Sequence, residues 1–306
     1  MIDIVPNKYI TYNCIENSIA NVCDAYGIDH RPIFLFSWDF GYHKAEKTVG
    51  EKVHYQYSGE IGFEKYIYLS KQFLDISITL KPANVETIKE AAEVGIIQLI
   101  STDSFYCPWN LAFHKYHYPH YYLLTHSENN DKLIVIDSFS SNNIIWLDKE
   151  QLREVKEVYH IEQFPLYSTN ISKLKSEFLH FITISNQRGI FELINEFASD
   201  LIQINSIEEL SPQIADVSNS YIIRRLSYIA NSRFNASKFM KYIGLCENHI
   251  IEMKNIYEKW ESLKNLFIKI LLSKKITLLK QAYENILSIS QEEKMLCNNI
   301  LDNERV

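Results

Sequence analysis

Glycine and proline are scarce in this sequence, whose 306 residues include only eight glycines and seven prolines. Hydrophobic residues make up 46% and charged residues 23% of the chain, values of an ordinary globular protein that exclude disordered and fibrous chains. No apolar run approaches the ~18 residues of a membrane-spanning helix, and the first residues lack the basic and apolar regions of a secretory signal. We therefore expect a globular, cytoplasmic protein that makes no membrane contact and has few long loops.

Cysteine and positive charge are also limited. The five cysteines are scattered and form no CxxC pair, so neither a zinc ribbon nor a disulfide framework is indicated. Reduced thiols in a cytoplasm are the simplest interpretation. The 31 Lys and Arg residues stand against 38 Asp and Glu residues, a formal net charge of −7. A negative chain without a basic run is not expected to bind nucleic acid.

The two halves of the chain differ in character. Residues 1–169 carry 14 basic and 22 acidic residues, a net charge of −8, and alternate helix-like with strand-like stretches. Residues 170–306 carry 17 basic and 16 acidic residues and almost no strand pattern. We predict an α+β domain over residues 1–169 and an all-α domain over residues 170–306.

A helical seam supports the all-α prediction, because apolar residues recur there at steps of three and four. The seam consists of Met253, Ile256, Trp260, Leu263, Phe267 and Ile270. Its simplest use is the core of a helical bundle. The alternative is a face for a partner helix, including one from a second copy in a homodimer.

Local patterns in the first half predict individual elements. A helix is expected over residues 16–25, and Gly27, two residues later, is a typical helix end. The further expectations are strands at 76–80 and 96–100, a helix at 83–94, a hairpin of strands at 121–125 and 133–136, and a strand at 144–147.

Cys14 directly precedes the first predicted helix. A helix N-terminus carries partial positive charge and unpaired N–H groups, which stabilise a thiolate. The backbone N–H groups of Cys14 and Ile15 could also hold the oxyanion of an acyl intermediate. The position indicates a nucleophile, with a small buried thiol as the alternative. We expect packing roles for Cys23, Cys246 and Cys297.

His120 and Asp137 stand at matching ends of the predicted hairpin. If the turn centres on residues 129–130, residue 120 pairs with residue 139, and Asp137 is its diagonal neighbour on the same face. A carboxylate there would orient an imidazole that deprotonates Cys14. A slip of one residue would place His120 and Asp137 on opposite faces.

Four of the ten histidines lie within 13 residues: His114, His117, His120 and His126. A zinc site is the alternative interpretation of this cluster, but no Glu or Cys is placed as a clear further ligand. We therefore expect no metal. His114 and His117 are expected to line a pocket mouth or to face solvent.

The order of these segments resembles a known family. The segments are Tyr12-Asn-Cys-Ile-Glu-Asn-Ser-Ile-Ala-Asn-Val, Thr102-Asp-Ser-Phe-Tyr-Cys-Pro-Trp109, Pro119-His-Tyr-Tyr-Leu-Leu and then Asp137. They resemble the butirosin biosynthesis protein H family, whose N-terminal domain is similar to the papain-like fold of bacteriocin-leader peptidases. The stretches 233–239 and 260–263 resemble that family's C-terminal region. The resemblance implies a papain-like cysteine-protease-type domain followed by an all-α domain.

The same resemblance implies an acyltransferase of natural-product, for example antibiotic, biosynthesis. Such proteins move an acyl group from the phosphopantetheine thioester of an acyl carrier protein to an amine of a small-molecule acceptor. No bound cofactor is implied beyond the donor's phosphopantetheine arm. The family's catalytic triad falls on Cys14, His120 and Asp137. Candidates for substrate binding, whose alternative is ordinary loop packing, are Asn13, Asp103, Tyr106 and Trp109.

One position departs from the related peptidases. They carry a Gln six residues before the cysteine as an oxyanion donor, and this chain has Lys8 there. The difference argues against a peptidase, although Asn7 and Asn13 are possible substitutes for the Gln. The other readings are a thioesterase, in which water resolves the acyl-enzyme, a non-catalytic binding protein on a papain-like scaffold, and an adaptor that works through its helical half.

Overall fold

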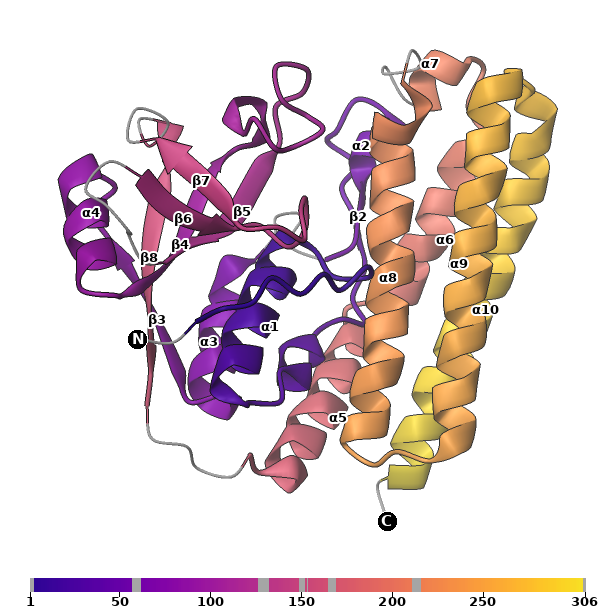
Figure 1. Cartoon of the computed structure of the whole chain (residues 1–306). Helices are drawn as coiled ribbons and strands as arrows, with labels where there is room; N and C mark the ends of the chain where they lie inside the picture. Colours follow the sequence, from indigo (N-terminus) through magenta and orange to yellow (C-terminus); the bar gives the residue numbers. More distant parts are fainter. Residues whose placement is uncertain are drawn as a thin grey trace. The chain divides into compact units, whose positions relative to one another are not determined.

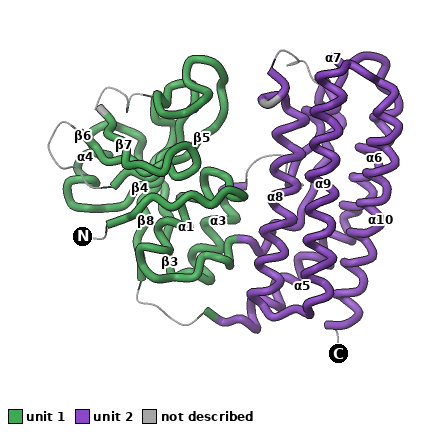
Figure 2. Tube along the Cα trace, turned by 45° about the vertical axis from the view of Figure 1, so that its right-hand side comes forward, with its two compact units in different colours: residues 1–33, 64–169 green, residues 34–63, 170–306 purple. Residues whose placement is uncertain are grey.

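A computed structural model shows a mixed α+β fold. It describes residues 3–56, 62–125, 132–148, 152, 154–164, 169–210 and 216–304. The chain forms two compact units, coloured separately in Figure 2: unit 1 comprises Met1–Ile33 and Glu64–Thr169, and unit 2 comprises Phe34–Phe63 and Asn170–Val306. Within the described residues, no helix combines the length and apolar character needed to cross a bilayer.

Unit 1 is built on one antiparallel sheet of six strands in the order β3-β8-β4-β5-β6-β7. The strands are β3 (Ile76–Lys81), β4 (Ile97–Asp103), β5 (Pro119–Leu124), β6 (Lys132–Ile136), β7 (Ile145–Asp148) and β8 (Glu157–Gln163). The helices of this unit are α1 (Cys14–Tyr26), α3 (Phe63–Phe73, whose first residue belongs to unit 2) and α4 (Val85–Glu93). Figure 1 shows α4 on one side of the sheet and α1 with α3 on the other. The sequence analysis missed β8 and α3.

The side of the sheet that carries α4 holds a continuous apolar core. Ile88 and Ala92 of α4 meet alternate residues of the strands, because every second side chain of a strand points to one face. The strand residues in this core are Ile100, Tyr122, Leu124, Leu133, Val135, Leu147 and Val158. Three of these strands, β4, β5 and β6, are thereby fixed near the ends that carry the predicted site residues.

Strands β5 and β6 pair in the predicted register. Leu123 faces Ile136 and Leu124 faces Val135, which is the pairing that places residue 120 opposite residue 139. The parity prediction for His120 and Asp137 is therefore confirmed. The predicted turn at residues 129–130 and His126 lie outside the described residues.

Helix α1 begins at Cys14, two residues before the predicted start. Asn13 is its N-cap, and Asn13 and Glu16 form a capping box in which each side chain accepts the other's backbone N–H. Gly27 ends the helix at φ 69°, a left-handed conformation that glycine adopts without strain. Residues 14–23 of the helix are all buried, and α1 packs against β5.

Unit 2 is mainly a bundle of long helices. Its helices are α5 (Ile171–Gln187), α6 (Ile190–Leu201), α7 (Ile207–Leu210), α8 (Tyr221–Tyr242), α9 (Glu247–Ser273) and α10 (Leu279–Glu304). The predicted seam lies on α9, and all six of its residues are at most 2% exposed. The bundle-core interpretation of the seam is therefore confirmed.

The segment 34–63 corrects the predicted domain boundary, because it belongs to the helical unit rather than to the α+β unit. It contains β1 (Gly41–Tyr42), α2 (Val49–Lys52) and β2 (Val53–His54). The Trp38 indole donates to Glu293, and both Tyr42 and Lys52 bind Asp200. Contacts between residues so far apart in sequence leave no local pattern from which the boundary could be predicted.

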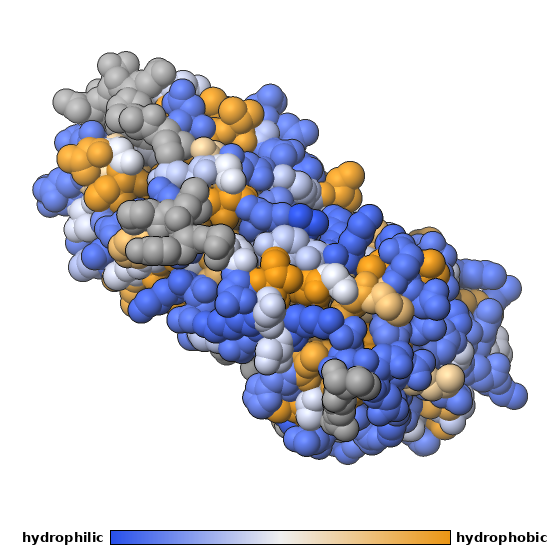
Figure 3. Space-filling view, turned by 90° about the horizontal axis from the view of Figure 1, so that it is seen from below, coloured by the Kyte–Doolittle hydropathy of each residue, from blue (hydrophilic) through white to orange (hydrophobic). Residues whose placement is uncertain are grey.

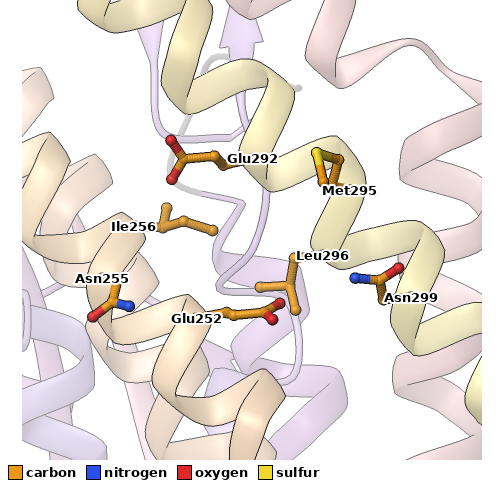
Figure 4. A pocket seen from close by; sticks show the side chains of 7 residues that line it. All are labelled: Glu252, Asn255, Ile256, Glu292, Met295, Leu296 and Asn299. Carbon is orange, nitrogen blue, oxygen red and sulfur yellow. The ribbon is translucent and has the colours of Figure 1, made fainter.

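We assign no function to two surface features of the molecule. On the face drawn in Figure 3, hydrophobic residues form separate patches among hydrophilic ones, which is usual for protein surfaces. A pocket of about 150 Å³ lies between α9 and α10 of unit 2 (Figure 4). It is lined by Glu252, Asn255, Ile256, Glu292, Met295, Leu296 and Asn299, and one of these, Glu292, already pairs with Lys259.

Candidate active site

The structure brings the three predicted triad residues together in unit 1. Cys14 is the first residue of α1, and its thiol lies near enough to the His120 imidazole to contribute to the raised pKa of that ring. The His120 Nε2 lies 2.6 Å from Asp137 Oδ2. Because Asp137 occupies Nε2, Nδ1 is the nitrogen left for the thiol. All three side chains are buried, with residue exposures of 8% for Cys14, 3% for His120 and 1% for Asp137.

Asp137 is held by more than His120. The Trp109 indole Nε1 donates to the same oxygen, Oδ2, at 2.7 Å, and the Ser140 backbone N–H donates to Oδ1 at 3.2 Å. Hydrogen bonds to a charged group are about twice as strong as those between neutral groups. The carboxylate therefore has a fixed orientation, and it fixes the imidazole in turn.

The buried pair favours the charged form of both groups. Burial alone would lower the pKa of His120, but the charge and hydrogen bond of Asp137, with a smaller contribution from Cys14, raise it to about 10. Burial would raise the pKa of Asp137, but His120, Trp109 and Ser140 together hold it below its usual range. At neutral pH the site therefore stabilises an imidazolium beside Cys14, the partner that a thiolate requires.

The N-terminus of α1 offers unused hydrogen-bond donors. The N–H of Glu16 binds the Asn13 side chain, and the N–H of Asn17 binds the Asn13 carbonyl. Among the described residues, no acceptor binds the N–H of Cys14 or Ile15. These two groups are the predicted oxyanion donors, and both are available next to the thiol.

The other cysteines lack this environment. Burial raises the pKa of Cys107 and of Cys297 to about 12 each, and it raises the pKa of Cys23 as well. These thiols stay protonated at neutral pH and behave as packing groups. Cys246 corrects our expectation, because it is exposed at the N-cap of α9 rather than packed.

The four candidate substrate residues differ in their surroundings. The Asn13 amide donates to Tyr66 Oη, and Trp109 binds Asp137, so both polar groups are already engaged within unit 1. Asp103 caps the short 3-10 helix Ser104–Tyr106 and binds His117 Nδ1 at 2.9 Å. Burial opposes ionisation of Asp103, yet the Phe105 N–H and His117 hold its pKa below the usual range. Tyr106 is 40% exposed and is the most accessible of the four.

The two asparagines named as possible substitutes for the peptidase Gln both have other hydrogen-bond partners. Lys8 is exposed, and the Asn7 amide donates to Asp24 at 3.3 Å. Asn13 is bound to Tyr66 and Glu16 as described. Any oxyanion stabilisation here would therefore come from backbone N–H groups.

The histidine cluster does not gather into a metal site within the described residues, where no three His, Cys, Asp or Glu side chains are close enough to hold an ion. His114 and His117 are exposed, as expected for residues that face solvent. His126 lies outside the described residues.

Sequence reasoning missed several contacts around the triad. The bond between Trp109 and Asp137 joins residues 28 positions apart and has no local signal. The capping box did have one, because Asn13 and Glu16 show its three-residue spacing. The repeat of asparagines at positions 13, 17 and 21, four residues apart, also places them on one helix face.

Comparisons with known proteins do not assign this chain to a family. No family model matches the chain, and no curated protein matches its sequence. The likeness to the butirosin biosynthesis protein H family is therefore a prediction from the residues quoted above. The functional argument is made from the triad and its surroundings.

Proposed function

We propose that this chain is a cysteine acyltransferase with a papain-like catalytic domain. It would move an acyl group from the thioester of an acyl carrier protein to an amine of a small acceptor. The observation that carries the proposal is the buried pair of His120 Nε2 and Asp137 Oδ2, 2.6 Å apart, with Cys14 at the start of α1 close enough to affect the pKa of His120. This is the arrangement that nucleophilic catalysis by a thiol needs.

The first step is acylation of the enzyme. The Cys14 thiolate attacks the thioester carbonyl carbon, and the resulting oxyanion lies against the N–H groups of Cys14 and Ile15. The tetrahedral intermediate then expels the phosphopantetheine thiolate, which takes the proton held by the His120 imidazolium. One thioester replaces another, so this step is close to isoenergetic and needs no nucleotide.

The second step transfers the acyl group. The acceptor amine attacks the acyl-Cys14 carbonyl carbon while His120 takes the amine proton. Collapse of the intermediate forms the amide, releases the Cys14 thiolate and restores the imidazolium. Asp137 stays charged throughout and holds the imidazole in its productive tautomer.

Two features favour a transferase over a peptidase. The position of the peptidase Gln is the exposed Lys8, and neither Asn7 nor Asn13 has a free side-chain amide. A thioester is more reactive than a peptide bond and needs less oxyanion stabilisation. The net charge of −8 on residues 1–169 favours a cationic acceptor such as an amino sugar or a polyamine.

Intact-protein mass spectrometry tests the proposal. The wild type, Cys14→Ala and Cys246→Ala would each be incubated with a small acyl-thioester and no acceptor. Cys246 is a matched control, since it is exposed and also lies at a helix N-terminus. We expect a gain of one acyl group in the wild type and in Cys246→Ala, and none in Cys14→Ala.

Addition of amines then separates transfer from hydrolysis. Formation of an amide faster than free acid supports the transferase. Free acid as the only product, with amines ineffective, would make the protein a thioesterase. An absence of both adduct and turnover with several thioesters would contradict catalysis and favour a binding protein on this scaffold.

A further inference from the structure

Three asparagines form a ladder along one face of α1. Asn13, Asn17 and Asn21 are spaced by four residues and are 7%, 1% and 1% exposed. Buried amides must find hydrogen-bond partners, because an unsatisfied one costs free energy. The partners of Asn17 and Asn21 are not side chains of the core. They are backbone groups of the extended segment that leads into Cys14.

Asn17 and Asn21 each bind both backbone groups of one residue in that segment. Asn21 Oδ1 accepts the N–H of Asn7 at 2.7 Å, and its Nδ2 donates to the Asn7 carbonyl at 2.9 Å. Asn17 Oδ1 accepts the N–H of Tyr9 at 2.9 Å, and its Nδ2 lies 3.2 Å from the Tyr9 carbonyl. The two amides therefore hold the backbone of Asn7 and Tyr9 against the helix.

The side chain of Asn17 also binds backbone carbonyls next to Cys14, whereas that of Asn21 does not. Asn17 Nδ2 donates to the carbonyls of Tyr12 and Asn13, at 3.0 Å and 3.1 Å, and the Asn17 backbone N–H binds the Asn13 carbonyl at 2.9 Å. Asn21 instead donates to the Asn17 carbonyl, within the helix. Of these two asparagines, only Asn17 therefore binds the carbonyls of the two residues before Cys14.

The Asn13 carbonyl and the Cys14 N–H belong to one planar peptide unit. In a trans peptide these two groups point in opposite directions, so fixing the carbonyl fixes the N–H. Asn17 holds that carbonyl from two of its own nitrogens. The Cys14 N–H, which has no acceptor among the described residues, is thereby given one set direction.

We propose that Asn17 is a positioning residue that aims the Cys14 N–H at the developing oxyanion. This inference rests on the proposed function, because it needs an acyl transfer whose carbonyl oxygen becomes negative. Asn17 touches neither the thiol nor, by this account, the substrate. Its contribution is to keep the donor preorganised, which is what makes an oxyanion hole effective.

Two reactions of the same sulfur separate this role from a purely structural one. Acylation by a thioester passes through an oxyanion. Alkylation by iodoacetamide displaces iodide from a methylene carbon and forms no oxyanion. A residue that only holds Cys14 in place affects both reactions, whereas a residue that aims the Cys14 N–H affects acylation alone.

The experiment measures both rate constants at Cys14 in the wild type, Asn17→Leu and Asn21→Leu. Leucine keeps the branching of the asparagine side chain and removes its polar atoms, and Asn21 is the control because its burial and its pairing with the backbone match those of Asn17. Thermal unfolding of each variant sets a temperature at which all are folded. For Asn17→Leu we expect kcat for thioester turnover to fall about 100-fold, the lower end of the ~10²–10³ for losing an oxyanion donor. Its KM and alkylation rate should stay near the values of the wild type and Asn21→Leu.

Equal effects of Asn17→Leu on acylation and alkylation would overturn the proposal, as would equal acylation rates in the two variants. Loss of cooperative unfolding in both Asn17→Leu and Asn17→Ala, with Asn21→Leu intact, would assign Asn17 to folding and also overturn it. If the wild type itself shows no acylation while its alkylation is normal, the proposed function has failed rather than the role of Asn17.

Discussion

Each unit of the molecule buries one carboxylate against a cation and at least one tryptophan, and the two sites differ in one respect. In unit 2, Glu293 accepts two bonds from Arg233 and one each from Trp38 and Trp260, all between 2.7 and 2.9 Å. In unit 1, Asp137 accepts from Trp109, from His120 and from the Ser140 N–H.

The two sites differ in the cationic side chain that binds the carboxylate. Arginine side chains keep their proton in proteins, and Arg233 Nη1 donates to the Asp39 carbonyl at 2.7 Å and to Ser232 Oγ at 3.3 Å, so every nitrogen of this guanidinium has a partner and the unit 2 network is closed. His120 has a titratable ring and uses only one nitrogen on Asp137, which leaves the other for Cys14. A closed network of this kind fixes a fold. A network in which a titratable ring keeps one nitrogen for a further partner can transfer a proton to or from that partner.

The largest expected effect comes from removing the titratable partner. His120→Ala should slow acylation of Cys14 about 10³-fold or more, because the proton donor to the leaving thiolate and the charge that stabilises the Cys14 thiolate are both lost. His117→Ala is the matched control, since His117 also pairs with an aspartate but is 63% exposed in its side chain. Stopped-flow acylation by a small thioester measures both. A similar loss in the two variants would remove the distinction between these histidines.

The closed network should instead respond in stability. Arg233→Met leaves Glu293 buried without its cation and should lower the free energy of unfolding by about 3–5 kcal/mol in urea titrations. The double variant Arg233→Met/Glu293→Leu should recover part of that loss, because no buried charge remains. A loss below about 1 kcal/mol for the single variant, the scale of an exposed pair, would contradict the account of this network.

A matched pair of tryptophans sharpens the comparison. Trp109→Phe and Trp38→Phe each remove one indole donor from a buried carboxylate, worth about 1.5–3 kcal/mol of stability. Only Trp109→Phe should also slow acylation, about tenfold if about 1.4 kcal/mol of transition-state stabilisation is lost with the orientation of Asp137. Unfolding and acylation measured on the same samples decide this. Equal acylation rates would mean that Trp109 only supports the fold.

A pH dependence of stability is also expected from the buried pair of unit 1. The pKa of His120 rises from 6.5 to about 10 on folding, so the folded state binds more protons between these values. Its contribution to stability is complete below pH 6.5 and is lost as the pH rises through about 10. The pKa of Asp137 is lowered from 3.8, so its contribution is present above that pH and is lost as the pH falls through the lowered value.

Urea titrations from pH 5 to 10 check this sign. The stability difference between the wild type and His120→Ala should shrink as the pH rises above 6.5. The difference between the wild type and the double variant Arg233→Met/Glu293→Leu should stay constant over the same range, because that variant leaves no carboxylate buried without its cation and arginine does not titrate there. A difference for His120→Ala that grows with pH would contradict the direction of the His120 shift.

The sequence predicted the parts of the site that depend on local pattern. Helix periodicity located α1 and therefore Cys14 at its start, and the period-two alternation of the hairpin gave the register that brings His120 and Asp137 to one face. Both signals arise within about 20 residues of chain. The type of residue at each position then supplied the chemistry.

The parts that the sequence did not predict depend on distant contacts. Strand β8 comes last of the six strands in the sequence but lies between β3 and β4 in the sheet. The strand that precedes it in the sequence therefore does not indicate its position. Trp38 finds Glu293 across 255 positions, which moves the segment 34–63 into unit 2. Trp109, a candidate for substrate binding, also donates to Asp137 across 28 positions.

Selective alkylation is the most direct test of the central claim that His120 activates Cys14. Wild type and His120→Ala would be treated with limiting iodoacetamide at pH 6, and modification of each cysteine would be followed by peptide mass spectrometry. Cys246 serves as the internal reference, because it is exposed and makes no side-chain hydrogen bond among the described residues. We predict that the buried Cys14 reacts much faster than Cys246 in the wild type and loses this advantage in His120→Ala. Reaction of Cys246 ahead of Cys14 in the wild type would contradict the account.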